Sequence, residues 1–453
     1  MTIHASKALT TTCRATPDGV ERGVRERLAT KVNGTYFGLW LLVPEYLRLG
    51  TWDRLCRWAG TDAAQLAPRV AFQLVNEAAL CSSGVRARQR MCHKGFELAN
   101  GLPWVAADAT IHRLLDAHTV QDASTYQIAL GITRAAAGHV HLQRVAIDPH
   151  RIPSTTQRDM VKTRPGPQAK PCKAASLFFA LDMDTKQPVA LVLTASAQTV
   201  SHVTPQLMHM VDALPRHGTL RVVADAEHCT AALLRAFVNH PGAELLTPAP
   251  CTARLRTIMQ ALPAHAFTRV CAGFAYATCP FAIRAAQPLT LLVQRTGERA
   301  NDYHYKPFVT TAAQCDDALV RLVEDFPDRW HIEEFFCHEA ALGWQRAGTH
   351  TLNIRFNQMA LALEAQAALF QLRQRLPAPA RLWSAPQLAA HLFSTLCGDL
   401  HVQRDTLVVT LYDAPFDPAL AQYYQQLPEI LTREAVDPRI PWLCNFKLRF
   451  RFR

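Results

Sequence analysis

The order of short apolar runs and helical stretches in the middle of the chain constrains the fold more than any other feature. Three β-like runs come first, a helical stretch follows, and a strand, a second helix and a short strand complete the series (139–147, 175–181, 188–194, 204–214, 220–224, 229–238 and 244–247). The run LRVVA at 220–224 is apolar except for one arginine, which suits a strand buried on both faces. The order predicts an antiparallel meander of three strands joined to parallel strands.

This β-β-β-α-β-α-β order is that of a ribonuclease-H-like core. A further β-like stretch at 252–311 follows it, and we interpret this stretch as an insertion before the last helix of the core. Apolar residues repeat at helical spacing before the core, and a strand–helix–strand pattern ends the chain. We therefore expect an α/β fold: a ribonuclease-H-like catalytic core with a β-rich insertion, a helical N-terminal domain and a small α+β C-terminal unit. The predicted boundaries are 1–135, 136–346 and 347–453.

The charge balance favours a polyanionic partner. The 453 residues include 48 Lys and Arg against 37 Asp and Glu, a formal net charge of +11, and 49% are hydrophobic, which excludes a disordered chain. Nucleic acid is the first candidate partner and an acidic membrane surface the second. No apolar run approaches the ~18 residues that a membrane helix needs, and no secretory signal is visible. The 13 cysteines lie scattered, with no Cys-x-x-Cys, which indicates reduced cysteines in a cytoplasmic protein.

Two basic stretches are candidates for contact with phosphate. The first is a cluster within nine residues: Arg86, Arg88, Arg90 and Lys94. The second is the last strand, 445–453, which alternates strictly, with Phe446, Leu448, Phe450 and Phe452 on one face and Lys447, Arg449, Arg451 and Arg453 on the other. Each stretch has an alternative interpretation. The first also suits a solvated helix face, and the second an edge strand protected by charge.

Three acidic residues stand where an α/β core would place a site. Asp148 follows the first strand and Asp225 follows the buried strand, and sites in open α/β sheets form beyond the carboxyl ends of the strands. Glu333 lies on a predicted helix, FPDRWHIEEFF at 326–336. A single aspartate at a strand end is usually a turn former or a helix cap, so the ordered set of three carries the prediction.

Three carboxylates from separate elements meet the needs of phosphodiester cleavage. In-line attack requires that charge be neutralised on the attacking and leaving oxygens, which two Mg²⁺ ions can do. Mg²⁺ accepts a few carboxylates together with waters and substrate phosphates. We therefore predict Asp148, Asp225 and Glu333 as catalytic residues and as ligands of Mg²⁺, with Mn²⁺ as a substitute.

The same helix carries an arginine on the stripe of Glu333. At about 100° per residue, Arg329 and Glu333 are i and i+4, whereas Glu334 points away. Arg329 is predicted to contact a DNA phosphate, and a surface ion pair with Glu333 is the alternative. Trp330 is predicted to pack in the core. Glu227 and His228 have a structural interpretation, with a role in orienting Asp225 as the alternative.

These residues resemble the Tyr-x2-Arg-x3-Glu-x6-Lys signature of bacterial insertion-sequence DDE transposases, in the branch with a β-strand insertion before the last acidic residue. The match rests on RWHIE at 329–333, FVTT at 308–311, DPHRI at 148–152 and DAEH at 225–228. The resemblance covers nearly the whole chain. It implies Mg²⁺-dependent excision of an insertion element and strand transfer, with double-stranded DNA (terminal inverted repeats and target) as the partner. It also implies a homodimer on paired ends and a nucleoid-associated place in the bacterial cytoplasm.

The chain departs from this signature at two positions. Phe326 replaces the tyrosine, and Ala340 replaces the lysine. Some relatives also use a tryptophan in the β insertion to hold a flipped base, whereas 252–311 contains no tryptophan; its nearest substitutes are aromatic residues such as Phe274, Tyr276, Tyr303 and Tyr305. Two alternative functions follow: a former transposase that only binds DNA, and a nuclease of the same core that hydrolyses without joining.

Overall fold

The chain folds into two compact units that do not follow one another along the sequence. The structure is a computed structural model and describes residues 17–60, 65–82, 85–156, 159–164, 170–195, 197–283, 286–312, 317–345 and 351–453. The central unit comprises Arg134–Phe336, and the terminal unit combines Met1–Thr133 with Cys337–Arg453. Segments from both ends of the chain therefore build one unit, whereas the sequence had predicted separate N-terminal and C-terminal regions.

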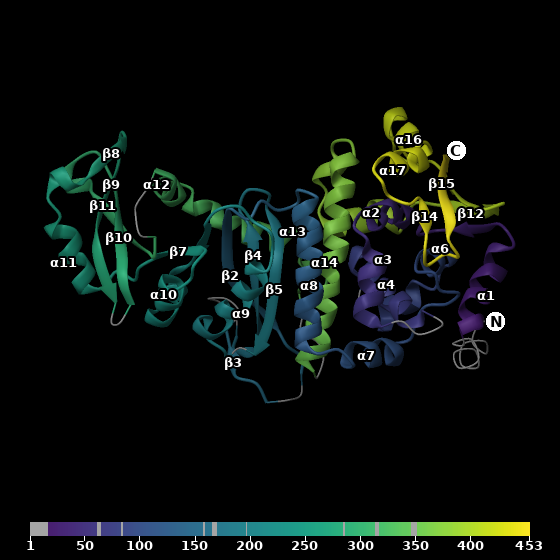
Figure 1. The fold of residues 1–453 in the computed structure, drawn as a ribbon, viewed down its shortest axis with the longest axis horizontal. Helices are drawn as coiled ribbons and strands as arrows, with labels where there is room; N and C mark the ends of the chain where they lie inside the picture. The colour runs from purple at the N-terminus through teal and green to yellow at the C-terminus, as the bar shows by residue number, and fades with distance from the viewer. Residues whose placement is uncertain are drawn as a thin grey trace. The chain divides into compact units, whose positions relative to one another are not determined.

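The central unit contains a mixed sheet of ten strands, in the order β3-β4-β2-β6-β7-β11-β10-β9-β8 with β5 paired to β4 (Figure 1). The strands are β2 (Arg144–Pro153), β3 (Lys162–Thr163), β4 (Cys172–Asp182), β5 (Gln187–Ala195), β6 (Leu220–Ala224), β7 (Ala243–Pro248), β8 (Thr268–Cys271), β9 (Phe274–Ile283), β10 (Ala286–Thr296) and β11 (His304–Thr310). The helices are α9 (Val200–Asp212), α10 (Ala231–Val238), α11 (Ala253–Ala261) and α12 (Asp317–Glu324).

The first half of this sheet has the predicted order of elements. β4 pairs antiparallel with β2 and β5, whereas β2, β6 and β7 run parallel, with α9 and α10 in the connections between parallel strands. β4 is buried from Ala174 to Asp182, as expected of a central strand with both faces covered. The mixed α/β class is therefore confirmed.

The first strand of this half continues further than the sequence predicted. We expected it to end at residue 147, before Pro149, but β2 runs to Pro153 and is paired with β4 from Val145 to Pro153. The proline is tolerated because β6 pairs with β2 only as far as Ile147, so the missing N–H faces no partner strand on that side.

The β-rich stretch after β7 extends the same sheet. β11 pairs antiparallel with β7 through three register partners, and β10, β9 and β8 follow outward by antiparallel pairing. Strands were predicted here, but α11 was not. Thr252 caps this helix by accepting the N–H of Leu255, a side-chain signal that lies at its first turn.

The segment that carries Glu333 begins as a tight turn and then becomes a helix. A 3-10 turn, η5 (Phe326–Trp330), leads into α13 (His331–Glu339). A 3-10 turn has about three residues per turn, so Phe326 and Arg329 eclipse each other and are both buried. Trp330 is rotated outward and is 56% exposed, so the prediction that it packs in the core was wrong.

The terminal unit is mainly helical with one five-stranded sheet. Its helices are α1 (Pro17–Leu28), α2 (Val43–Arg48), α3 (Thr51–Ala59), α4 (Leu66–Ala79), α5 (Val85–Arg90), α6 (Lys94–Ala99), α7 (Asp108–Asp116), α8 (Val120–Ala136), α14 (Leu352–Arg375), α15 (Ala385–Leu388), α16 (Pro418–Gln425) and α17 (Leu427–Arg433). The sheet has the order β1-β12-β13-β15-β14, formed by β1 (Val32–Gly34), β12 (Gly398–Gln403), β13 (Thr406–Leu411), β15 (Phe446–Phe452) and β14 (Arg439–Ile440).

A buried ion pair joins the two segments of the terminal unit. Glu364 on α14 accepts hydrogen bonds from Arg54 on α3, at 2.9 and 3.0 Å, and from Tyr126 on α8 at 2.7 Å. Arg54 and Glu364 are 4% and 0% exposed, so loss of either partner would leave an uncompensated buried charge. In the part of the chain that the structure describes, no helix is long and apolar enough to cross a membrane.

Candidate active site

Asp148 and Asp225 lie side by side on two adjacent interior strands of the central sheet. Ile147 and Ala224 are the last register partners of β2 and β6, so each aspartate is the next residue on one of two adjacent parallel strands. Neighbouring strands are about 4.8 Å apart, which brings the two carboxylates together although 77 residues separate them in the chain. The sequence predicted that each aspartate follows its strand: Asp225 does follow β6, whereas Asp148 lies within β2.

α13 brings the third carboxylate to the same face of the sheet. Phe336 stacks on His150 with ring centroids 4.1 Å apart and meets the edge of Phe179 at 4.9 Å. Phe179 is the register partner of Asp148 on β4, so these aromatic contacts hold α13 over the side of the sheet that bears Asp148. Glu333, in the first turn of α13, is exposed.

Arg329 connects η5 to the first aspartate. Its Nη1 donates to Oδ1 of Asp148 at 2.8 Å, and both side chains are largely buried. In the described part of the chain no ion pair joins Arg329 to Glu333, which excludes the predicted alternative of a simple i,i+4 surface pair. Glu334 instead accepts a hydrogen bond from His331 Nδ1 at 2.9 Å, which accords with the expectation that it points away from the site.

The electrostatics of Asp148 show that several acids surround it. Burial raises the pKa of Asp148 to about 7, and Arg329 opposes this shift. The charges of Asp225, Glu333 and Glu227 raise it further. Burial is thus the main cause of the raised pKa of Asp148, and the neighbouring acids add to it although Arg329 is close.

Asp225 is held by its own chain. Burial raises its pKa, but the hydrogen bond from His228, the charge of Arg329 and the N–H of Glu227 outweigh burial and lower it below its usual range. His228 Nδ1 and the backbone N–H of Glu227 both reach Oδ1 of Asp225, at 2.9 and 3.0 Å. Oδ1 therefore already accepts two hydrogen bonds, and Oδ2 is the oxygen of Asp225 that is left for a ligand.

His228 was predicted mainly as a structural residue, and the structure supports its alternative interpretation. The side chain is 0% exposed, and its Nε2 has no hydrogen-bond partner among the described residues. An imidazole that is fully buried for one hydrogen bond to Asp225 is costly unless that bond matters. Glu227 is exposed and lies 3.4 Å from Arg151 at the rim.

Lys306 is a site residue that sequence reasoning missed. β11 runs antiparallel to β7, so the residues before Phe308 extend past the edge that bears Asp148 and Asp225. The Nζ of Lys306 lies 4.7 Å from the ring of Phe326 and 5.1 Å from that of Phe308. Burial and the charge of Arg329 lower the pKa of Lys306, which shows that the two cations are neighbours. Only the pairing of β11 with β7 reveals this position.

The carboxylates suit a divalent cation by donor type. Their oxygen ligands are those that Mg²⁺ prefers, and the charges of Asp225, Glu333 and Glu227, which together with burial raise the pKa of Asp148, are charges that a cation would offset. Among the residues that the structure describes, no group of three Asp, Glu, His or Cys side chains is close enough to hold an ion by itself. Mg²⁺ usually takes only one or two carboxylates and completes its shell with water and substrate phosphate.

The basic residues of the terminal unit that were predicted to contact phosphate differ in their exposure to solvent. Arg88 is 7% exposed and pairs with Glu77 at 2.8 Å and with Asp108, so it stabilises the fold and is not available to DNA. Arg90 and Lys94 are exposed, and the side chain of Arg86 lies outside the described residues. The sequence could not reveal the partners of Arg88, because both lie on other helices.

The predicted alternation of β15 is seen in the burial of its central residues, whereas Phe446, Lys447, Arg451 and Phe452 are all half-buried. Leu448 and Phe450 are 0% and 1% exposed, while Arg449 and Arg453 are exposed. Lys447 pairs with Asp405 at 2.9 Å, and Arg451 donates to Gln403 at 3.1 Å. β15 lies between β13 and β14, although β14 covers only its first two residues.

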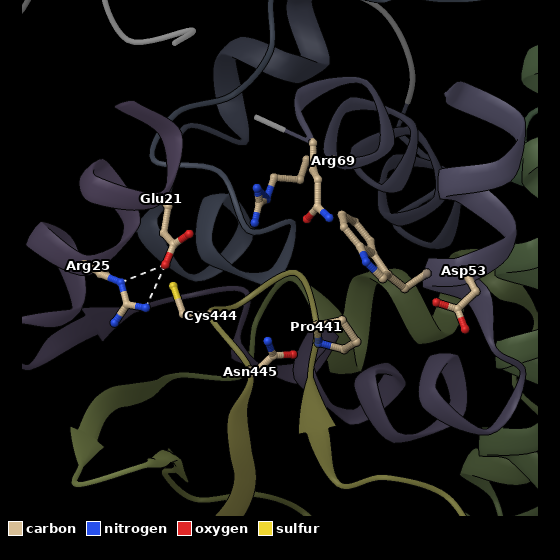
Figure 2. A pocket seen from close by; sticks show the side chains of 9 residues that line it. Glu21, Arg25, Asp53, Arg69, Pro441, Cys444 and Asn445 are labelled. Atoms are coloured by element: carbon tan, nitrogen blue, oxygen red, sulfur yellow. Dashed lines mark hydrogen bonds and ion pairs between the residues drawn. The ribbon is translucent and has the colours of Figure 1, made fainter. Parts of the chain in front are cut away.

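Figure 2 shows a separate hollow of about 380 Å³ in the terminal unit. Arg25 and Glu21 on α1 form an ion pair at 2.7 Å beside the thiol of Cys444. Arg69 and Asp53 line the same hollow, so two cations face two carboxylates. The balanced charge gives this hollow no preference for a polyanion.

Comparison with known proteins identifies no family for the chain. No family model matches it, and no curated protein matches it. Among solved structures, the chain is similar to a piggyBac transposase, seen in a cryo-EM structure of its synaptic complex with hairpin DNA. The identity is 9%, the TM-score is 0.43, and the match covers 80% of this chain and 82% of that chain. At this score the likeness decides neither fold nor function, so the residues of the site must carry the argument.

Proposed function

We propose that this chain is a DDE DNA transposase with a ribonuclease-H-like core, which excises an insertion element and joins it to target DNA. One observation carries the proposal. Asp148 and Asp225 lie side by side on the adjacent parallel strands β2 and β6, and η5, which leads into the helix that bears Glu333, places Arg329 on Asp148 at 2.8 Å. The resemblance of RWHIE to the transposase signature and the net charge of +11 support it.

The three carboxylates would hold Mg²⁺, which when bound supplies neutralising charge to the attacking and leaving oxygens of a phosphodiester. The chain itself positions the groups. His228 and the Glu227 N–H fix Asp225 so that Oδ2 is free, and the buried ring of Phe326 supports Arg329 and Lys306. These two cations lie where a scissile phosphate would need compensation. Water is the first nucleophile and the freed 3′-OH is the second, without a covalent enzyme intermediate.

The departures from the signature are partly compensated by this geometry. Phe326 lacks the signature hydroxyl, but its ring lies against two cations, at 4.7 Å from Lys306 and 5.8 Å from Arg329. Lys306 supplies a positive charge near the site, whereas the position of the signature lysine is occupied by Ala340. The basic side chains of the terminal unit and a homodimer on paired ends complete the proposal. The reaction belongs to the bacterial cytoplasm, where the element's DNA lies.

The test is cleavage of labelled DNA by the purified chain. The substrate is a duplex that carries the inverted repeats flanking the gene, with Mg²⁺ or Mn²⁺. Asp148→Ala, Asp225→Ala and Glu333→Ala should each abolish cutting with DNA binding nearly intact, and Glu334→Ala is the matched control that should cut normally. Wild-type cutting followed by a joined product supports a transposase. Cutting without joining would indicate a nuclease, and binding without cutting would indicate a DNA-binding former transposase.

A further inference from the structure

Arg295, on β10, is clamped between two aromatic rings at the outer part of the central sheet. Its guanidinium carbon lies 4.1 Å from the ring centroid of Phe267 and 4.3 Å from that of Tyr303. Two aromatic rings therefore contact the guanidinium, and such contacts restrict the orientation of the group. Its N–H groups lie in the plane, so a ligand must approach the edge.

A second arginine shares the cross-strand row of Arg295. Ala275 on β9 is the register partner of both Arg269 on β8 and Arg295 on β10, so the two arginines flank it on the same side of the sheet. Ala275 is 4% exposed and leaves the space between them to the longer side chains. The pair brings two positive charges to the same side of this part of the sheet.

These arginines line a hollow of about 410 Å³, here called the insertion hollow. Glycines form part of its wall: the N–H of Gly297 donates to the carbonyl of Gly273 at 2.9 Å. Gly297 has φ of +117°, and a Cβ there would meet the carbonyl oxygen of Asp302 at 2.4 Å, so this position of the wall does not accept a side chain. Glu298 also lines the hollow, so two arginines face one carboxylate.

We propose that the insertion hollow binds a phosphodiester of DNA, with Arg295 as the bidentate donor and Arg269 as a second contact. A planar fork that two aromatic rings hold in place suits a ligand with two acceptor oxygens at its edge, as phosphate has. The stacked guanidinium occupies the inner faces of Phe267 and Tyr303, so this site takes the backbone and not a stacked base. That the phosphodiester belongs to DNA rests on the proposed function.

The test measures how DNA affinity depends on salt. Log affinity falls with log salt by about 0.9 per phosphate contact for duplex DNA and about 0.7 for single strands. Arg295→Gln should therefore flatten the slope by about the amount of one phosphate contact. Arg269→Gln, combined with it, should flatten the slope further. A short duplex and a single-stranded oligonucleotide of the same sequence show which form of DNA supplies the phosphate. Arg299→Gln is the matched control, since Arg299 is exposed nearby but does not line the hollow.

Two further variants separate recognition from folding. Glu298→Gln should tighten binding, because it removes the one carboxylate that opposes the ligand, and loss of fold cannot mimic a gain. Phe267→Leu combined with Tyr303→Leu keeps both charges, so it should weaken affinity while the slope stays close to wild type. Equal slopes for Arg295→Gln, Arg299→Gln and the wild type, with Glu298→Gln unchanged, would overturn the proposal. Because the readout is binding, failure of cleavage alone would count only against the proposed function.

Discussion

Arg329 donates to the carboxylate of Asp148 at 2.8 Å, across a sequence separation of 181 residues. The contact unites the first strand of the sheet with the element that leads into α13, and it places the guanidinium among acids. In the absence of DNA, this cation is engaged by the protein. A phosphate at the site would compete with Asp148 for it.

Arg329→Ala should slow cleavage by about 100-fold, because loss of one preorganised charge at a reacting phosphate costs about this much. Lys94→Ala should cost far less, because Lys94 is an exposed side chain of the terminal unit. The measurement is the single-turnover cleavage rate at saturating DNA. Equal losses in the two variants would show that Arg329 only holds Asp148 in place.

The stability of the metal-free protein should depend on the pH through Asp148. Its folded pKa of about 7 lies above the usual value of about 3.9, so between these limits the folded state binds more protons than the unfolded state. Stability is therefore lost as the pH rises through this window. Relative to wild type, Asp148→Asn should gain up to about 4 kcal/mol between pH 4 and pH 8.

Urea unfolding at both ends of the window, in EDTA, measures this difference. Only the change with pH is diagnostic, since the substitution also alters the hydrogen bond to Arg329. Asp325→Asn, which removes an exposed partner of Arg144, serves as the control and should show little change. A wild-type and Asp148→Asn difference that stays constant from pH 4 to pH 8 would contradict the raised pKa.

His228 should act by orienting Asp225. His228→Asn places an amide N–H near the position of Nδ1 and should retain most activity, whereas His228→Gln and His228→Ala should not. Loss of a residue that orients a metal ligand typically costs 10–100-fold in metal affinity or activity. The readout is the Mg²⁺ concentration that gives half-maximal cleavage. If Asn and Gln behave alike, the hydrogen bond to Asp225 has no positioning role.

Lys306 should contribute one phosphate contact near the site. Lys306→Gln is expected to reduce the salt slope of duplex binding by about 0.9 and to slow cleavage. Lys186→Gln is the matched control, because Lys186 is exposed in the β4–β5 hairpin, at the opposite edge of the parallel strands. Similar slopes for both variants and wild type would place Lys306 outside the DNA path.

The C-terminal strand should contribute through its unpaired end. Arg449→Gln with Arg453→Gln should flatten the salt slope by up to about 1.8, or about 0.9 for each contact. Lys447→Gln with Arg451→Gln should do less, because these side chains already contact Asp405 and Gln403. Buried Leu448 and Phe450 are untouched, so the strand should still pack. The reverse ranking in filter-binding titrations would contradict this assignment.

The parts of the fold that could be predicted are those set by local periodicity. β6 was placed residue by residue, because an apolar run of strand length between turns has few alternatives. Asp225 could be placed directly after β6 for the same reason, whereas Asp148 was predicted to follow a strand in which it actually lies. Pro149 misled the prediction because its tolerance depends on where β6 stops pairing, which is a property of the sheet and not of β2 alone.

The misplaced residues depended on distant partners or on helix type. Trp330 was assigned to the core because it lies between predicted site residues on a helix that was taken to be buried, whereas it ends the 3-10 turn η5 and is exposed. Arg88 was assigned to a solvent-exposed patch because the sequence cannot show that Glu77 and Asp108 reach it. Lys306 and Arg295 stand out only once the strand register is known.

The register of β11 against β7 has a metric consequence. Each strand from β2 and β6, which bear the aspartates, to β10, which bears Arg295, is hydrogen-bonded to the next. The central sheet therefore fixes the number of strands that separate the two points. The distance between the clamped guanidinium and the carboxylates is set by strand spacing and changes little with side-chain motion. A nucleic acid that contacts both the carboxylates and Arg295 must span this distance, and the backbone of the protein fixes it.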